Sequence, residues 1–103
     1  MKEHFIKCKD EYKEFIPIIQ QCLDQLQCGK GIKRHGEIGV PFRHHGTYKI
    51  MEKCGIGFPV GQMIKKCMEL MGFEEHDAQV KELIGAVCYG LMCLMYMQDK
   101  EGK

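Results

Sequence analysis

Serine and asparagine are absent from this 103-residue sequence, and Thr47 is its only threonine. The lack of serine excludes a serine nucleophile. A cysteine nucleophile stays open, with His35, His44 or His45 as its base, because the sequence does not place any of the seven cysteines beside a particular histidine.

A strong charge imbalance is missing as well. Fifteen lysines and arginines against fourteen acids leave a net charge of +1, and 45% of the residues are hydrophobic, as in a globular protein. The isoelectric point of about 7.6 argues against a protein that binds nucleic-acid duplexes, which usually carries a basic surplus over its whole surface. We expect one domain, residues 1–98, whose core is marginal alone, and a flexible tail, 99–103.

Metal-binding and disulfide patterns are also lacking. The cysteine number is odd and charges interrupt the apolar residues at the N-terminus, so we expect no signal peptide, reduced thiols and a cytoplasmic location. No C-x-x-C pair occurs. The nearest candidates, Cys22 with Cys28 and His44 with His45 and Cys54, have separations that match no common zinc site, so we predict neither metal nor cofactor.

What is present is helical periodicity. Near the N-terminus, apolar residues alternate spacings of three and four, at Phe5, Cys8, Tyr12, Phe15, Ile19, Cys22 and Leu26. Pro17 interrupts this stripe, which predicts either one kinked helix or two helices that break near Ile16. The stripe covers the core of its own chain or contacts a partner subunit; both readings stay open.

Two further helices are expected in the middle of the chain. A short one, 47–54, is capped by the Thr47 hydroxyl and stopped by Gly55. The next has Pro59 in its first turn and an apolar stripe that ends at Gly72. Together with the other elements, they predict an all-α fold, a small helical bundle with a glycine-rich basic loop.

The last helix should run from about Asp77 to Gln98 and is apolar on every face from Leu83 onward. Such a helix is surrounded by protein, and this short chain has little to cover it. We therefore expect an oligomer built on this helix, with full burial within one subunit as the alternative. The uncharged run from Leu83 to Met97 spans only about 22 Å, short of a bilayer of about 30 Å, so we expect no membrane helix.

The segment GKGIKRHGEIGVPFRHHGTYK is a local basic patch. Between Gly29 and Lys49, five lysines and arginines face one acid, Glu37, which gives +4. Glycine-flanked amides and arginine forks suit phosphate, and a second glycine-rich element, 55–66, leads into a helix N-terminus that favours anions. Aromatic rings nearby suit stacking on a base. The alternative is that the glycines only stop helices and the cations form a solvated surface.

The hypothesis is a phosphate-bearing, nucleotide-derived ligand that is bound without catalysis. The residues assigned to it are Lys30, Lys33, Arg34, His35, Phe42, Arg43, His44, His45, Tyr48 and Phe58. One alternative is a metal-dependent nucleotide phosphohydrolase that uses the pair His76 and Asp77, although other ligands of such sites are missing downstream. Another is an interaction protein that inhibits a host partner.

The segments GKGIKRHG, PF, GFPVGQMIKK and KELIGAVCYGL, within residues 29–97, resemble the layout of small uncharacterised bacteriophage proteins. The helical plan is similar to that of phage sponge proteins, which assemble into oligomers and trap cyclic nucleotide or cyclic ADP-ribose immune signals. This resemblance implies an anti-defence sponge in the host cytoplasm. It supplies no binding motif, so the site residues above rest on local chemistry.

Overall fold

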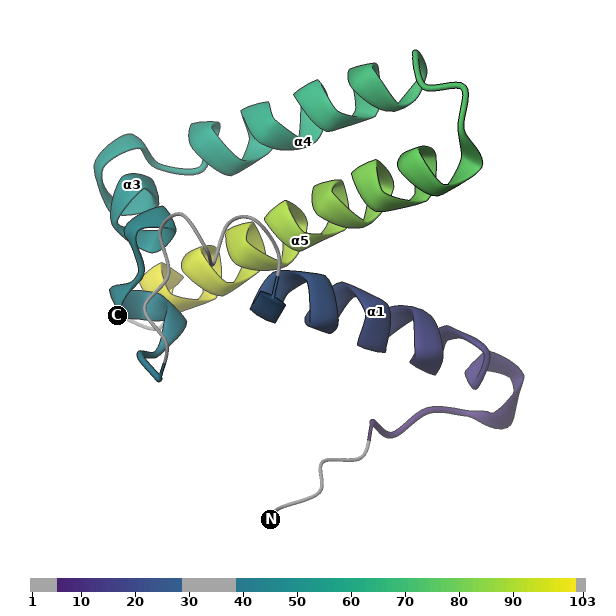
Figure 1. The fold of residues 1–103 in the computed structure, drawn as a ribbon. Helices are drawn as coiled ribbons and strands as arrows, with labels where there is room; N and C mark the ends of the chain where they lie inside the picture. Colours follow the sequence, from purple (N-terminus) through teal and green to yellow (C-terminus); the bar gives the residue numbers. More distant parts are fainter. Residues whose placement is uncertain (1–5, 29–38, 102–103) are drawn as a thin grey trace.

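The computed structural model describes residues 6–28 and 39–101, and these residues contain helices and no strand (Figure 1). The predicted all-α fold is confirmed. The elements in chain order are the 3₁₀ helix η1 (Asp10–Tyr12), α1 (Phe15–Cys28), the 3₁₀ helix η2 (Phe42–His44), α3 (Gly46–Cys54), α4 (Gly57–Leu70) and α5 (His76–Glu101).

The break in the first helical region lies before Phe15. Residues Asp10–Tyr12 form η1, and the Ile16 N–H donates to the Lys13 carbonyl oxygen at 3.1 Å as α1 begins. Pro17 is then the third residue of α1, where a missing N–H costs no intrahelical hydrogen bond. Neither predicted arrangement is found: residues 6–9 are not helical, η1 is a single 3₁₀ turn, and α1 begins at Phe15 and continues through Ile16.

The boundaries of α3 and α4 lie at the glycine and proline residues from which they were predicted. Gly55 has a φ of +72° and donates its N–H to the Met51 carbonyl oxygen at 2.7 Å, which ends α3 where the sequence predicted. The predicted Thr47 cap is wrong: α3 begins at Gly46, its N-cap is His45, and no side chain caps it. Pro59 lies in the first turn of α4, fully buried.

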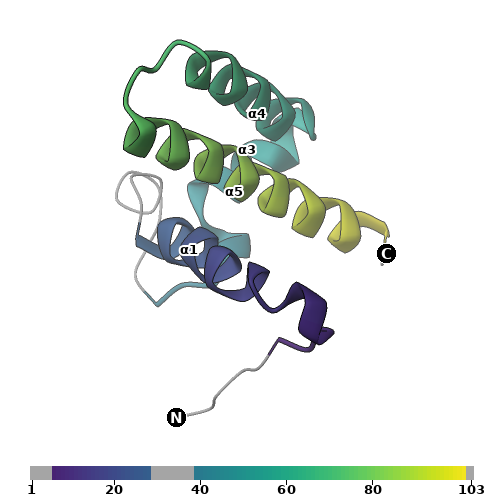
Figure 2. The same cartoon turned by 90° about the vertical axis from the view of Figure 1, so that its right-hand side faces the viewer.

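The long helix α5 is the centre of the fold. In both Figure 1 and Figure 2 it lies between α4 and α1, and it contacts both helices. The Cys88 thiol donates to the Cys22 carbonyl oxygen of α1 at 3.4 Å, and Lys66 of α4 forms an ion pair with Glu82 at 2.9 Å. The helix runs to Glu101, beyond the predicted end at Gln98, and Asp99 is hydrogen-bonded rather than in a loose tail.

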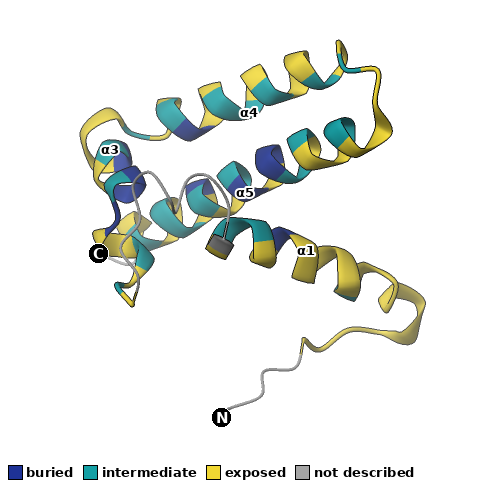
Figure 3. Ribbon diagram, viewed as in Figure 1, coloured by how far each residue is buried: buried dark blue, intermediate teal, exposed yellow. Residues whose placement is uncertain are grey.

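The core of the described residues is small. Met51, Ala86, Cys88 and Cys93 are buried on the inner sides of α3 and α5, with Cys22 as the buried apolar residue of α1. Figure 3 shows most of α1 as exposed. The stripe predicted on α1 is therefore covered only near Cys22, whereas Tyr12, Phe15 and Ile19 remain exposed in the single chain.

Candidate functional site

A polar cluster forms where η2 and α3 meet the C-terminal end of α5. The Arg43 guanidinium donates from Nε and Nη2 to the two Asp99 carboxylate oxygens, both at 2.6 Å. The Tyr48 hydroxyl donates to Asp99 Oδ2 at 2.7 Å. A forked guanidinium–carboxylate pair is geometrically specific. These bonds hold η2 and α3 to a helix more than fifty residues away in sequence.

The Asp99 carboxylate keeps Tyr48 and Arg43 protonated. The hydrogen bond to Asp99, together with burial, raises the pKa of Tyr48 to about 12. The same carboxylate raises the pKa of Arg43. Tyr48 is therefore a neutral donor at physiological pH, so its hydroxyl does not serve as a general base there.

Aromatic rings pack behind the cluster. The Tyr48 ring lies 6.0 Å from Phe42 and 5.7 Å from Tyr96, both edge-on, and Phe42 lies 5.5 Å from His45. The His45 Nε2 is 2.7 Å from the Val40 carbonyl oxygen, to which it donates. His45 is only 8% exposed. Phe42, His45 and Tyr48, all predicted ligand residues, thus also build the packing that holds η2 on α3 and α5.

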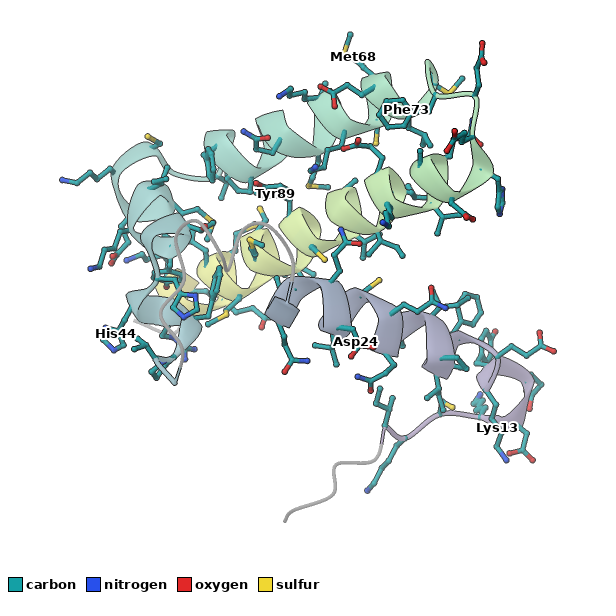
Figure 4. The ribbon with its side chains drawn as sticks, viewed as in Figure 1. Lys13, Asp24, His44, Met68, Phe73 and Tyr89 are labelled. Atoms are coloured by element: carbon teal, nitrogen blue, oxygen red, sulfur yellow. The ribbon has the colours of Figure 1, made fainter. Side chains whose placement is uncertain are left out.

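An open depression of about 340 Å³ lies on the outer side of this cluster. It is lined by Arg43, His44, Tyr48, Lys49, Glu52, Asp99 and Lys100. Three lysine and arginine cations face two carboxylates, which leaves +1 without His44. The His44 side chain is exposed and projects from the end of η2 (Figure 4). Lys100 Nζ lies 3.9 Å from a Glu52 oxygen.

The predicted ligand residues divide into three groups. Arg43, His44 and Tyr48 come together at the depression. Phe42, His45 and Phe58 are not among its lining residues: Phe42 and His45 pack behind the cluster, and the Phe58 ring packs edge-on against Tyr89, 6.0 Å away. The predicted residues Lys30, Lys33, Arg34 and His35 lie outside the described residues.

Sequence reasoning did not include Glu52, Asp99 and Lys100 in the site, and it counted Lys49 in the basic patch without naming it as a ligand residue. Glu52 is an ordinary surface charge by sequence, and Asp99 and Lys100 were both assigned to the tail, 99–103. No local pattern links them to Arg43. The bidentate contact between Arg43 and Asp99 depends on how α5 crosses η2, so only the tertiary fold reveals it.

The residues of the phosphohydrolase alternative lie elsewhere. His76 and Asp77 form the first turn of α5 and are exposed. Within residues 6–28 and 39–101, no three histidines, cysteines or acids are grouped so that they could hold a metal ion.

A second surface is apolar and runs along α4 and α5. On α5, exposed apolar side chains follow one face, at Val80, Leu83, Val87, Leu91, Leu94 and Met97. On α4, Val60, Ile64, Met68 and Met71 are exposed. Where the helices meet, an open groove of about 430 Å³ is lined by Val60, Met63, Val87, Gly90, Leu91, Cys93 and Leu94. One chain therefore leaves the long apolar helix partly uncovered.

The length and hydropathy of α5 also meet the requirement for a membrane span. Its 26 residues include a window with a mean hydropathy of 1.4, of which 22% is buried. The core helix of a soluble protein has the same properties, so this is weak evidence for a membrane.

Comparison of the chain with protein-family models, with curated proteins and with solved structures finds no match.

Proposed function

We propose that this protein binds a small phosphate-bearing molecule, such as a nucleotide-derived signal, and sequesters it without catalysis. The observation that carries the proposal is the convergence of Arg43, Lys49 and Lys100, from η2, α3 and α5, around one open depression. The depression has a volume of about 340 Å³ and is open to solvent, which leaves room for a phosphate group.

Asp99 already fills the fork of Arg43, which leaves Lys49, Lys100 and His44 as the groups that face a ligand. A carboxylate already occupies the guanidinium fork with two short hydrogen bonds, which is the geometry that a phosphate also takes. A bound phosphate would lie beside this pair, on Lys49, Lys100 and His44. The exposed face of these cations is open to solvent, so the ligand needs no entry path.

The basic residues that precede residue 39 in the sequence also favour an anionic ligand. Lys30, Lys33, Arg34 and His35 precede η2 in the chain by few residues, and they carry the positive charge on which the prediction rested. Sequestration of a cyclic nucleotide or a cyclic ADP-ribose immune signal, as in the phage sponges that the sequence resembles, is the specific form of the proposal.

The test is native mass spectrometry and calorimetry of the purified chain with a panel of cyclic nucleotides and ADP-ribose derivatives. We expect a bound ligand of unchanged mass. Lys49→Gln combined with Lys100→Gln should weaken binding at least about tenfold, since a charged hydrogen bond contributes about 1.5–3 kcal/mol.

Lys65→Gln is the matched control, because Lys65 is an exposed lysine of α4 outside the depression. Equal affinity of the double variant and this control would overturn the site. Conversion of a nucleotide to product would support the phosphohydrolase instead.

A second element of the proposal is association of copies through α5, as the sequence led us to expect. It is favoured by the apolar face, where Leu83 and Leu94 are 50% and 55% exposed in one chain. An interaction protein that covers this face with a host partner is the competing function. Large contiguous apolar patches on a protein surface mark interaction sites.

A further inference from the structure

Two buried cysteines meet where α1 packs on α5. The Cys88 thiol donates to the Cys22 carbonyl oxygen at 3.4 Å, and the two residues are 5% and 6% exposed. Both carry free thiols. Cys93, the other buried cysteine of the described residues, has the Met97 thioether as its sulfur neighbour, at 3.9 Å. Among the buried thiols that the structure describes, Cys22 and Cys88 are therefore the pair that joins two helices.

The backbones of the two helices approach closely at this pair. A carbonyl oxygen lies about 2.4 Å from the Cα atom of its own residue, so the Cys88 sulfur lies within about 6 Å of the Cys22 Cα. A second contact, from Gln25 Nε2 to the Lys81 carbonyl oxygen at 3.4 Å, holds α1 against α5 on one side of the pair. A disulfide needs Cα atoms about 4.4–6.8 Å apart. Rotation of the two side chains, with a small shift of α1, brings the sulfurs to bonding distance.

We propose that Cys22 and Cys88 form a reversible disulfide that fixes α1 on α5 when the protein meets an oxidant of the glutathione-disulfide class. The thiols are reduced at rest, and oxidation adds a covalent bond between residues that are 66 positions apart in sequence. The proposal does not depend on the ligand site beside η2 or on association through α5. It makes the attachment of α1 depend on the redox state of the surroundings.

α1 is the helix whose attachment a disulfide changes most. It contacts α5 less extensively than α4 does, and most of it is exposed (Figure 3). Its apolar residues Tyr12, Phe15 and Ile19 are 56%, 57% and 39% exposed. A thiol is a weak hydrogen-bond donor, so the contact of Cys88 with Cys22 holds α1 only loosely. We expect α1 to separate from α5 by local opening, which exposes both thiols to a reagent.

The exchange takes two steps that balance. With α1 open, the Cys22 thiolate attacks one sulfur of the glutathione disulfide, a mixed disulfide forms on Cys22, and one glutathione thiolate leaves. The Cys88 thiolate then attacks the Cys22 sulfur, and the second glutathione thiolate leaves. The two cysteines lose two electrons and two protons. One glutathione disulfide takes them up and becomes two glutathione thiols.

Burial makes the bond slow to form and slow to break. In the closed fold, burial and the neighbouring Cys22 raise the pKa of the Cys88 thiol to about 11, so little thiolate is present at neutral pH. A thiol whose thiolate is destabilised is also a poor leaving group, which protects a disulfide that contains it from attack. We therefore expect a lasting attachment of α1 rather than a rapidly exchanging bond.

The experiment places the reduced full chain in glutathione buffers with a rising proportion of disulfide, followed by an acid quench and mass spectrometry. We expect the native chain to lose two hydrogens without a glutathione adduct, and a digest to contain the Cys22 and Cys88 peptides linked. The melting temperature should rise by at least about 10 °C, because a bond across a long loop restrains the unfolded chain. Dithiothreitol should reverse both changes.

Cys22→Ala and Cys88→Ala each remove one partner of the bond. Each variant should lose the linked peptides and the rise in melting temperature, and a cysteine left without its partner should keep glutathione as an adduct. The control is Cys54→Ser combined with Cys67→Ser, because both thiols are exposed, on α3 and α4. This double variant should form the link to the same extent as the wild type.

The wild-type chain in concentrated urea separates a link set by the fold from a random one. Short loops close more easily than a loop of 66 residues, so in urea Cys22 should pair with Cys28, and Cys88 with Cys93. A native chain whose thiols stay free, or that forms those short pairs instead, would overturn the proposal. So would a Cys22–Cys88 link that leaves the melting temperature unchanged, because α1 would then not be held by it.

Discussion

Two parts of the α5 surface contrast: the polar contacts at its C-terminal end and the exposed apolar face along its length. At its C-terminal end, Asp99 accepts hydrogen bonds from Arg43 and Tyr48, and the rings of Tyr48 and Tyr96 pack together. Along the apolar face of the helix, Leu83, Val87 and Leu94 stay exposed in the single chain. The polar groups at the C-terminal end thus find hydrogen-bond partners within a single chain. The apolar side chains would need more protein surface to cover them than one chain supplies.

The largest expected effect on stability comes from removing a buried side chain of α3. Met51 of α3 is fully buried, and Met51→Ala should lower the free energy of unfolding by about 2–5 kcal/mol through the lost burial and the cavity. Met71→Ala, at a side chain that is 83% exposed, should change it by less than about 0.5 kcal/mol. Urea denaturation followed by circular dichroism measures both. Equal losses would contradict the packing described for α3.

A smaller effect is the loss of folding stability at alkaline pH, where Tyr48 ionises. The pKa of Tyr48 is raised to about 12 in the fold from an ordinary value of 10, so its contribution to stability is complete below pH 10. That contribution falls as the pH rises from 10 through about 12. Tyr48→Phe should remove this part of the pH dependence, as shown by urea midpoints at a series of pH values.

A second titrating group provides the control for that series. Burial raises the pKa of the Cys88 thiol from 9 to about 11, so its contribution is lost at lower pH, between 9 and 11. Cys88→Ala should flatten that earlier part and leave the later one. If Tyr48→Phe retained the full loss above pH 10, the hydrogen bond to Asp99 would not be its cause.

The smallest expected effect is a change in melting temperature when Gly90 of α5 is replaced by alanine. A methyl group there meets only the flexible Met63 side chain, and alanine favours helix over glycine by about 0.5–1 kcal/mol. Gly90→Ala should therefore raise the melting temperature of the dilute chain slightly, by calorimetry. A melting temperature that falls would show that Met63 cannot make room for the methyl group.

The helix boundaries in the middle of the chain were predictable because their causes are local. Gly55 ends α3 through its positive φ, and Pro59 fits the first turn of α4, where no N–H is needed. The cap of α3 was not predictable in the same way. Thr47 has the right side chain, but η2 places His45 at the N-cap and buries Thr47.

The candidate site was predictable only in part. The local surplus of cations pointed to Arg43 and His44, which do line the depression. The same reasoning could not show that Asp99 occupies the Arg43 fork, or that the His45 imidazole is bonded to Val40. A count of the charges in one segment does not show which of them form ion pairs with residues of a helix far away in the sequence.

The sequence by itself determined the all-α class, the stops at glycine, and a last helix that is apolar on every face, since each follows from φ/ψ preference or periodicity within a few residues. Only the tertiary structure decided which face of α5 is covered and which side chains meet at its end. Those facts depend on how α1 and α4 lie on α5, and contacts across fifty residues leave no local pattern.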